Sequence, residues 1–324
     1  LDLTAAEGLG DLIEAETGAQ RRQALRQMEG GLAALYEGWR TRLIRALAHL
    51  EAEIDFADED LPPEISRQAQ SALGALKAEI ARHLDDGRRG EVLRDGLSVA
   101  ILGAPNVGKS SLINALTRRD TAIVSAIAGT TRDIVEARLD LGGYPILLAD
   151  TAGLREADAA GGGDPIEQEG IRRALKRAEH ADLRILVFDA RTGPDPVITP
   201  LIGPDSILVA NKADLLALPL VDVPAGAVTV SAVKGQRIEA LRDRLAEEAE
   251  ARMVAGPAPA ITRLRHRTSL IETVAGLERA ALASSPELIA EDVRLAARAL
   301  GRITGRVDVE DLLDVIFREF CIGK

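Results

Sequence analysis

The chain has 324 residues, of which 46% are hydrophobic, 28% are charged and only 2% are aromatic. This balance indicates a globular protein of about two domains whose cores are filled by aliphatic side chains. The formal net charge of −11 argues against a protein that coats nucleic acid by general charge attraction. One cysteine excludes an internal disulfide framework, and no apolar run approaches the roughly 20 residues of a membrane span. We therefore expect a cytoplasmic protein without membrane contact.

Residues 1–93 carry apolar side chains at intervals of three and four, which predicts helices throughout this stretch. One apolar stripe runs without a gap over residues 25–54, and a second covers residues 65–84 after an acidic break that contains two prolines. Trp39 and Met28 fall on the first stripe, so they are predicted to be core residues and not parts of a ligand site.

The pattern changes between residues 94 and 257, where short β-type runs alternate with helical patterns. Helices are expected over residues 167–179 and 238–249. The expected strands cover residues 97–102, 134–141, 146–148, 185–188, 207–209 and 228–230. Such alternation predicts an α/β domain with a mostly parallel sheet and helices on both faces.

Residues 258–324 return to helical patterns, with apolar stripes over residues 264–277, 288–300 and 309–317. We expect these helices to pack against those of residues 1–93. The prediction is one discontinuous all-α helical bundle with the α/β domain inserted into it. Two separate helical domains would give the same pattern.

A phosphate-binding loop is predicted where the first strand of the α/β domain meets a helix. Residues 103–110 read GAPNVGKS and fit G-x-x-x-x-G-K-[ST], whose glycines let successive N–H groups surround a phosphate at a helix N-terminus. Lys109 is expected to reach the β- and γ-phosphates, and the Ser110 hydroxyl to bind Mg²⁺. The predicted contacts in this loop are Asn106, Val107, Gly108, Lys109, Ser110 and Ser111.

Two further motifs follow apolar strands and specify the nucleotide. Asp150 opens the sequence DTAG and is suited to hold Mg²⁺, while the Gly153 amide is placed to meet the γ-phosphate. Asp214 ends the sequence NKAD and is suited to accept hydrogen bonds from guanine, which favours GTP over ATP. The predicted contacts outside the phosphate loop are Asp150, Thr151, Ala152, Gly153, Asn211, Lys212, Asp214, Ser231 and Ala232.

A polar segment at residues 125–133 is predicted to be a switch, in which Thr131 binds Mg²⁺ and senses the γ-phosphate. A plain connector between strands is the alternative reading. Leu154 stands where Ras-like enzymes carry the glutamine that orients the attacking water. Spacing alone does not choose its replacement among the nearby carboxylates Glu156, Asp158, Asp164, Glu167 and Glu169.

Six stretches together carry a family resemblance: GAPNVGKSSLINAL, IVSAIAGTTRD, DTAGLRE, IEQEGIRRA, NKAD and the final CIGK. They resemble the MnmE (TrmE) family of bacterial and organellar tRNA-modification GTPases over essentially the whole chain. The resemblance implies a GTPase domain (94–257) inserted into a helical domain formed by residues 1–93 and 258–324. It also implies transient pairing of two GTPase domains, with K⁺ in place of an arginine finger.

Several site residues follow from this resemblance. Asn106 matches a K⁺ ligand, and the K⁺-binding loop that completes the site matches Ser125, Ile127 and Thr130. Glu167 matches the residue that orients the attacking water by way of a second water. Physically, a cation between the β- and γ-phosphates would stabilise the charge that develops during hydrolysis.

The resemblance further implies modification of the wobble uridine of tRNA at carbon 5 with an aminomethyl-type group, together with a flavin-dependent MnmG-type partner. Cys321 is a candidate participant in that chemistry, with an inert buried cysteine as the alternative. The family's N-terminal domain binds a tetrahydrofolate derivative and forms the constitutive dimer. Because the chain begins at Leu1 without that domain, we expect it to be part of a longer protein.

A ribosome-assembly GTPase without a covalent substrate shares the GTPase motifs and is the alternative function. Two arginine groups are candidate RNA contacts, and both also fit an ion-paired surface. They are Arg263, Arg265 and Arg267 with His266, and Arg294, Arg298 and Arg302.

Overall fold

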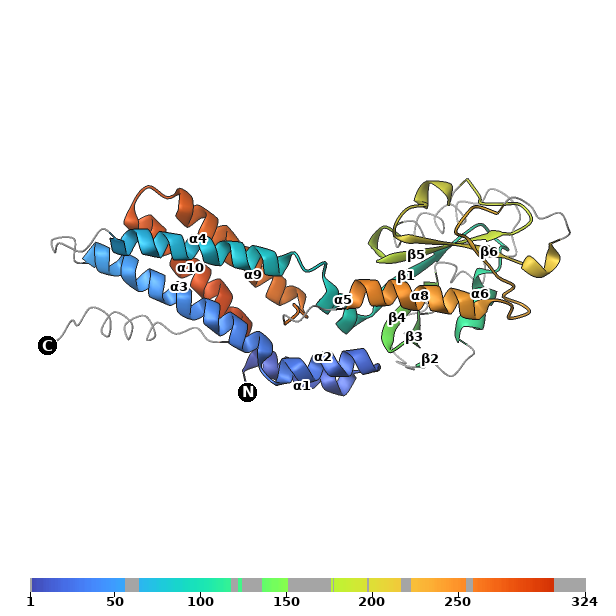
Figure 1. The fold of residues 1–324 in the computed structure, drawn as a ribbon, viewed down its shortest axis with the longest axis horizontal. Coiled ribbons are helices and arrows are strands. Elements are labelled where there is room, and N and C mark those ends of the chain that lie inside the picture. Colours follow the sequence, from blue (N-terminus) through green and yellow to red (C-terminus); the bar gives the residue numbers. More distant parts are fainter. Residues whose placement is uncertain are drawn as a thin grey trace. The chain divides into compact units, whose positions relative to one another are not determined.

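The computed structural model describes most of the chain in nine stretches. They are residues 2–55, 64–117, 122–123, 136–150, 176, 178–196, 198–216, 223–254 and 259–305. The chain forms two compact units (Figure 1). The helical unit comprises Leu1–Ala15, Gln20–Arg94 and Val254–Lys324, and the α/β unit comprises Glu16–Ala19 and Asp95–Met253.

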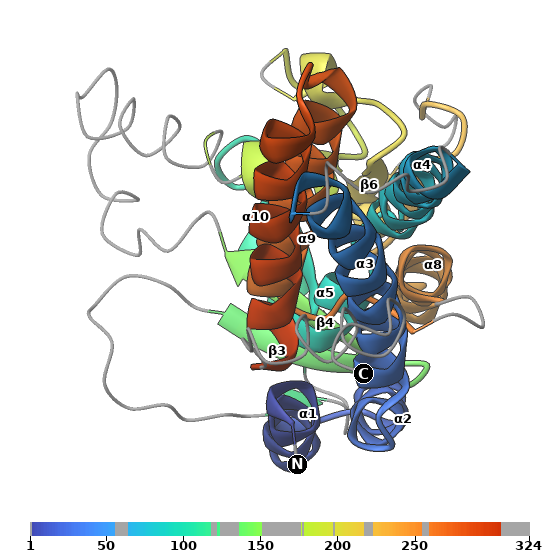
Figure 2. The ribbon, with the colours of Figure 1, turned by 90° about the vertical axis from the view of Figure 1, so that its left-hand side faces the viewer.

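Seven helices are described in and around the helical unit. They are α1 (Leu3–Glu14), α2 (Gly18–Met28), α3 (Gly31–Asp55), α4 (Glu64–Leu84), α5 (Arg89–Asp95), α9 (Leu264–Leu282) and α10 (Pro286–Thr304). Helices α3, α4, α9 and α10 run alongside one another as a bundle (Figure 1, Figure 2). The bundle therefore joins the two ends of the sequence.

One hydrophobic core spans this bundle. Tyr36 and Trp39 from α3, Leu76 from α4, Leu277 from α9 and Val293 from α10 all contribute buried side chains. These positions recur at intervals of three and four along each helix, so each helix turns one apolar stripe inward. The predicted packing of the C-terminal helices against the N-terminal ones is confirmed for α9 and α10, and so is the burial of Trp39. The stripe predicted over residues 309–317 lies outside the described residues. Met28 is only half-buried and lies outside the core.

The structure corrects the predicted helix pattern at two places. The stripe predicted over residues 25–54 is divided into α2 and α3 at Gly30, whose φ of +85° ends the first helix. Helix α5 follows the charged stretch at residues 85–89, where the sequence shows no apolar stripe. Its packing explains the helix, because Gly90, Glu91 and Leu93 are buried.

The α/β unit is built on a seven-stranded sheet in the order β2-β3-β4-β1-β5-β6-β7. The strands are β1 (Leu97–Leu102), β2 (Ala122–Ile123), β3 (Glu136–Leu141), β4 (Tyr144–Asp150), β5 (Leu183–Asp189), β6 (Ser206–Asn211) and β7 (Val228–Thr229). Strands β4, β1, β5, β6 and β7 are parallel, and β2 and β3 extend the sheet in antiparallel fashion. A two-residue Gly142-Gly143 turn with positive φ angles joins β3 to β4. The mostly parallel sheet is confirmed.

Helices cover the sheet on both faces, as predicted. Helices α6 (Lys109–Thr117) and α8 (Ile238–Met253) contact each other and strands β3 and β4. A separate apolar cluster brings the helical residue Ala178 against Leu186 and Phe188 of β5. No helix among the described residues is long and apolar enough to cross a membrane. Apart from residues 176 and 178–179, the helix predicted over 167–179 lies outside the described residues.

Candidate nucleotide-binding site

The predicted phosphate loop connects the carboxyl end of β1 to the first residue of α6, and packing requires both of its glycines. A Cβ atom on Gly103 would lie 2.2 Å from the Val187 carbonyl oxygen of β5. A Cβ atom on Gly108 would lie 2.4 Å from Asn211 Nδ2, and its φ of +96° also favours glycine. The loop backbone is therefore held close to the neighbouring strands.

The polar groups of this loop gather at the start of α6. Lys109 Nζ donates hydrogen bonds of 2.9 Å to the carbonyl oxygens of Gly103 and Ala104, so the ammonium group lies over the loop. Asn106 is exposed with a φ of +60°, and Ser110 is exposed in the first turn of α6. An ammonium, exposed hydroxyl and amide groups and a helix N-terminus together form a site suited to a phosphate anion.

Asn211, the first residue of the NKAD sequence, links the phosphate loop to the segment at Ala232. This residue ends β6 and is only 2% exposed. Its Nδ2 donates to the Val107 carbonyl oxygen at 2.8 Å, and its Oδ1 accepts from the Ala232 backbone N–H at 3.0 Å. Three segments that are far apart in sequence therefore meet at the carboxyl ends of β1 and β6.

Asp214, the predicted guanine contact, is also held in place. It lies in a 3₁₀ turn over Ala213–Leu215, and its Oδ1 accepts a 2.6 Å hydrogen bond from Ser231 Oγ. The Lys234 backbone N–H donates to the same Ser231 Oγ at 3.2 Å. The hydrogen bond from Ser231 holds the pKa of Asp214 below its usual value, so the carboxylate remains ionised at neutral pH.

Sequence reasoning missed one acidic residue, Asp189, at the carboxyl end of β5. Its Oδ2 lies 3.1 Å from Lys212 Nζ, while its Oδ1 accepts from the backbone N–H of Arg191 at 3.0 Å. Hydrogen bonds from Arg191 hold the pKa of Asp189 well below its usual range. Lys212 has a φ of +64°, so Asp189 helps to fix a lysine whose backbone is left-handed. An acidic residue ending a central parallel strand was the available signal.

Other predicted site residues are not placed by the structure. The backbone of Asp150 ends β4 beside Ile101 of β1, at the same edge of the sheet, but its side chain lies outside the described residues. The following also lie outside the described residues: Ser125, Ile127, Thr130, Thr131, Thr151, Ala152, Gly153, Glu167 and Cys321.

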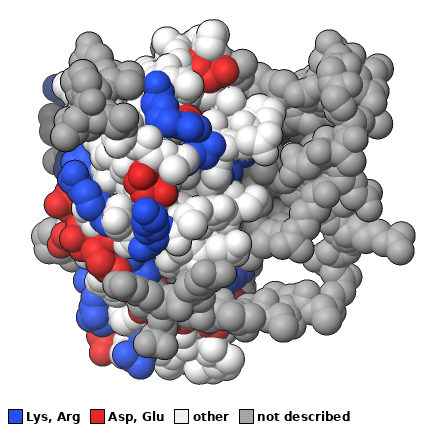
Figure 3. Space-filling model, turned by 90° about the vertical axis from the view of Figure 1, so that its right-hand side faces the viewer, with Lys and Arg blue, Asp and Glu red and all other residues white. Residues whose placement is uncertain are grey.

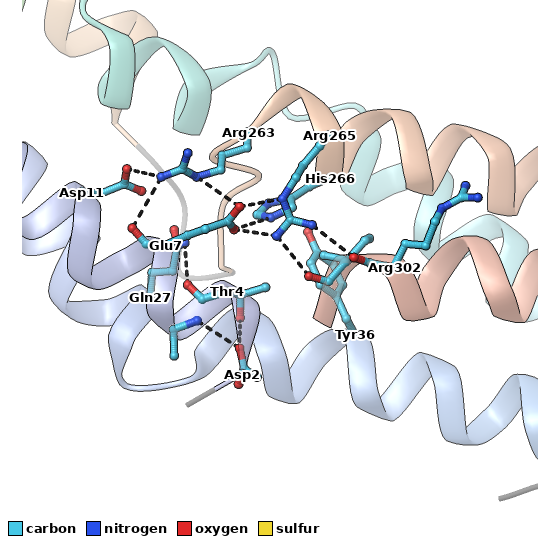
Figure 4. Close-up of polar contacts among 12 residues, drawn as sticks. Asp2, Thr4, Glu7, Asp11, Gln27, Tyr36, Arg263, Arg265, His266 and Arg302 are labelled. Atoms are coloured by element: carbon cyan, nitrogen blue, oxygen red, sulfur yellow. Dashed lines mark hydrogen bonds and ion pairs between the residues drawn. The ribbon is translucent and has the colours of Figure 1, made fainter. Parts of the chain in front are cut away.

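The first arginine group that was a candidate for RNA contact, at residues 263–267, forms ion pairs within the protein (Figure 4). Arg265 Nε and Nη2 donate to the two carboxylate oxygens of Glu7 in α1 at 2.5 and 2.7 Å, and His266 Nε2 lies 3.0 Å from Glu7 Oε2. Arg263 pairs with Asp11 at 2.6 Å. These charges are used to hold α1 against α9.

Most of the remaining arginines that were candidates for RNA contact also form ion pairs with carboxylates. Arg267 contacts Asp86 and Glu91 at 2.6 and 3.0 Å. Arg294 pairs with Glu51 and Glu291, and Arg302 pairs with Glu272. Figure 3 shows a different part of the surface, on the right-hand side of Figure 1, where Lys and Arg side chains are likewise interspersed with Asp, Glu and uncharged side chains. The ion-paired alternative therefore describes both arginine groups, except for Arg298.

Comparison with known proteins decides which family this arrangement belongs to. A family model described as the MnmE helical domain matches residues 3–321. The tRNA modification GTPase MnmE of Parvibaculum lavamentivorans is 58% identical over the whole chain, which spans 73% of that relative. The chain belongs to the MnmE family. It is a GTPase and binds GTP and GDP.

One further relative agrees with this assignment. The tRNA modification GTPase MnmE of Rhodospirillum rubrum is 57% identical, again over the whole chain and 71% of the relative. A solved G domain of the Thermotoga maritima FeoB iron transporter is 29% identical and covers 47% of this chain and 97% of its own, with a TM-score of 0.32. MnmE membership accounts for both units, because the matched residues run through the helical unit and the inserted α/β unit, which we now call the GTPase unit.

Proposed function

We propose that this GTPase drives modification of the wobble uridine of tRNA at carbon 5, adding an aminomethyl-type group together with a flavin-dependent MnmG-type partner. One observation carries this proposal. Asn211 joins the phosphate loop to the segment at Ala232, which is proposed to contact guanine, within a chain that is 58% identical to a tRNA modification GTPase over its full length. The chain thus combines a specific nucleotide site with the relatives' connection to tRNA.

The described residues fit a nucleotide with its magnesium ion. Lys109 and the loop N–H groups would hold the β- and γ-phosphates, and Asp214 would accept from the guanine N1–H and 2-amino group. The exposed Ser110 hydroxyl at the start of α6 is a hard oxygen ligand of the kind that Mg²⁺ prefers. Asp150 and Thr131 are the proposed further Mg²⁺ ligands, and the bound ion would supply positive charge at the phosphates.

Potassium is the second proposed ion. The Asn106 side chain is exposed at the loop, where its carbonyl oxygen suits a weakly held cation. Ser125, Ile127 and Thr130 are the proposed completing ligands, and Glu167 is the proposed residue that orients the attacking water. A cation in this place would supply the positive charge that an arginine finger gives in other GTPases. We expect two GTPase units to pair when this site is used.

The ion proposal is tested by GTP hydrolysis in K⁺ and in Na⁺ at matched ionic strength, over a range of protein concentrations. We expect hydrolysis to be faster in K⁺ and its rate per molecule to rise with concentration, because pairing of GTPase units completes the site. Asn106→Ala should remove most of the preference for K⁺. Equal rates in the two salts would contradict the proposal.

The tRNA proposal is tested by mass analysis of tRNA from cells that lack the protein. We expect unmodified wobble uridines in those cells. Normal wobble uridines would instead favour the alternative, a ribosome-assembly GTPase. A role for Cys321, a tetrahydrofolate derivative bound through an N-terminal domain and a cytoplasmic location stay predictions.

A further inference from the structure

Helix α2 presents three arginines that the nucleotide site does not use. Arg21, Arg22 and Arg26 are exposed, and none of them forms a hydrogen bond or ion pair in the described part of the chain. The sequence of α2, GAQRRQALRQM, contains no acidic residue. These three side chains, which we call the α2 arginine face, therefore carry uncompensated positive charge on a chain whose net charge is −11.

The opposite face of α2 is fixed to the helical unit. Gln20 and Gln23 donate to the backbone carbonyl oxygens of Arg94 and Gly90 at 2.9 and 3.0 Å, and Gln27 donates to that of Thr4 at 2.9 Å (Figure 4). Positions 20, 23 and 27 lie on one side of a helix. The arginines occupy the other side, so they project from a helix that is already anchored.

This exposure distinguishes the α2 arginine face from the ion-paired arginines of the helical unit. Arg263 and Arg265 are bound to Asp11 and Glu7, and Arg294 is bound to Glu51. A guanidinium that is already paired with a carboxylate has its N–H donors and its charge engaged, so it binds a phosphate less well. The arginines of α2 are not engaged in this way, so they remain available for an external anion.

We propose that the α2 arginine face contacts the phosphodiester backbone of tRNA. Guanidinium groups bind phosphate oxygens through two parallel N–H donors and keep their charge at any physiological pH. Three of them within two turns of one helix match a ligand that carries a phosphate at every nucleotide. This inference rests on the proposed function, because it takes tRNA as the substrate and assigns where its backbone is held.

The test measures tRNA affinity for the full chain between about 50 and 200 mM KCl, by anisotropy of a fluorescently labelled tRNA. We expect Arg21→Gln/Arg22→Gln/Arg26→Gln to bind at least about fivefold more weakly, and to lower the slope of log affinity against log salt by about 2. GTP hydrolysis without tRNA should be unchanged, because these residues lie outside the nucleotide site.

The matched control is Arg294→Gln/Arg298→Gln/Arg302→Gln, which changes the net charge equally but removes two arginines that are already paired. We expect it to change affinity less than about twofold. Replacing the three α2 arginines by lysine should preserve most of the salt slope. Because the lysine variant keeps the charge, it shows whether the glutamine variant binds tRNA more weakly through loss of charge or through loss of folding.

The inference is overturned if the α2 glutamine variant binds tRNA as the wild type does, or if the control variant loses as much affinity. It is also overturned if the wild-type chain has no affinity for tRNA. The modification state of tRNA in cells lacking the protein tests the proposed function independently of α2. Failure of the proposed function and failure of the α2 inference therefore give different experimental results.

Discussion

Two glycines with similar backbone angles differ in what surrounds them. Gly108 has a φ of +96° and Gly143 a φ of +89°, so alanine is strained at both. A Cβ atom at Gly108 would also lie 2.4 Å from Asn211 Nδ2, whereas one at Gly143 would meet no atom within 4 Å. We expect Gly108→Ala to lower the free energy of unfolding by about 1–3 kcal/mol more than Gly143→Ala, because it breaks the buried bond from Asn211 to Val107.

The measurement is denaturant unfolding of the GTPase unit by far-ultraviolet circular dichroism, together with GDP binding. Only Gly108→Ala should weaken GDP binding. Equal effects of the two substitutions would show that Asn211 does not restrain the phosphate loop.

Glu7 makes the stability of the helical unit depend on pH. Burial opposes its charge, but hydrogen bonds from His266 and Arg265 outweigh burial and lower the pKa of Glu7 to about 2. Burial also lowers the pKa of His266, so at pH 7 the neutral ring donates its Nε2–H to Glu7. A carboxyl with a depressed pKa stabilises the fold above its ordinary value of 4.5 and loses that effect as the pH falls toward 2.

We therefore expect Glu7→Gln to lower the free energy of unfolding by about 2 kcal/mol at pH 7, after allowing for solvent screening. The difference from the wild type should shrink between pH 4.5 and about 2. Unfolding is followed by the fluorescence of Trp39, which lies in the same unit. Glu14→Gln, an exposed position on the same helix, is the control and should change stability by less than about 0.5 kcal/mol. A difference that is constant with pH would contradict this role for Glu7.

The residues of the nucleotide site were predictable to different degrees. The phosphate loop and the NKAD sequence are contiguous motifs, and the structure joins them through Asn211. Asp189 was missed because its contact with Lys212 runs between neighbouring strands of the sheet and leaves no spacing pattern along the chain. The arginines at 263–267 left two readings open, since a sequence does not show which carboxylates lie opposite them.

At the scale of elements, hydrophobic periodicity predicted the helices better than their ends. The stripe over residues 25–54 continues through a turn at Gly30, because Met28 and Leu32 on either side of the turn keep the spacing of four residues along the sequence. The signal for the break was the Gly30-Gly31 pair, and Leu25 on the far side of it is 43% exposed. Helix α5 was not predicted as a separate helix, because a short helix held mainly by tertiary packing has little pattern of its own.

The contact between α9 and α10 depends on one glycine. A Cβ atom on Gly276 would lie 3.1 Å from both the Ala296 Cβ and the Asp292 carbonyl oxygen. We expect Gly276→Val to lower the free energy of unfolding by about 1–3 kcal/mol, because the two helices must separate. Gly74→Ala on α4 is the counterpart, with nothing within 4 Å, and should raise stability by about 0.5–1 kcal/mol.

Urea unfolding followed by Trp39 fluorescence measures both changes, since Trp39 lies in the bundle core. If Gly276→Val were as stable as the wild type, the close approach of α9 and α10 would not be needed for packing.

At the scale of the whole molecule, the sequence left open whether the two helical regions form one domain. The buried core answers this, because it contains Trp39 from the N-terminal region and Val293 from the C-terminal region. Periodicity shows which face of each helix is apolar, but not which other helix covers it. Contacts between segments more than 200 residues apart therefore had to come from the structure.

The two units are compact by themselves, so we expect ligand binding to stabilise only the unit that holds the ligand. Trp39 is the only tryptophan and lies in the core of the helical unit, so its fluorescence reports the unfolding of that unit alone. GDP at about 100 times its dissociation constant should stabilise the GTPase unit by about 2.7 kcal/mol, seen as an upward shift of its calorimetric transition. The Trp39 transition should keep its midpoint. An equal shift of both would show that the chain unfolds as one cooperative body, so that GDP bound at β1 and α6 also stabilises the helical bundle.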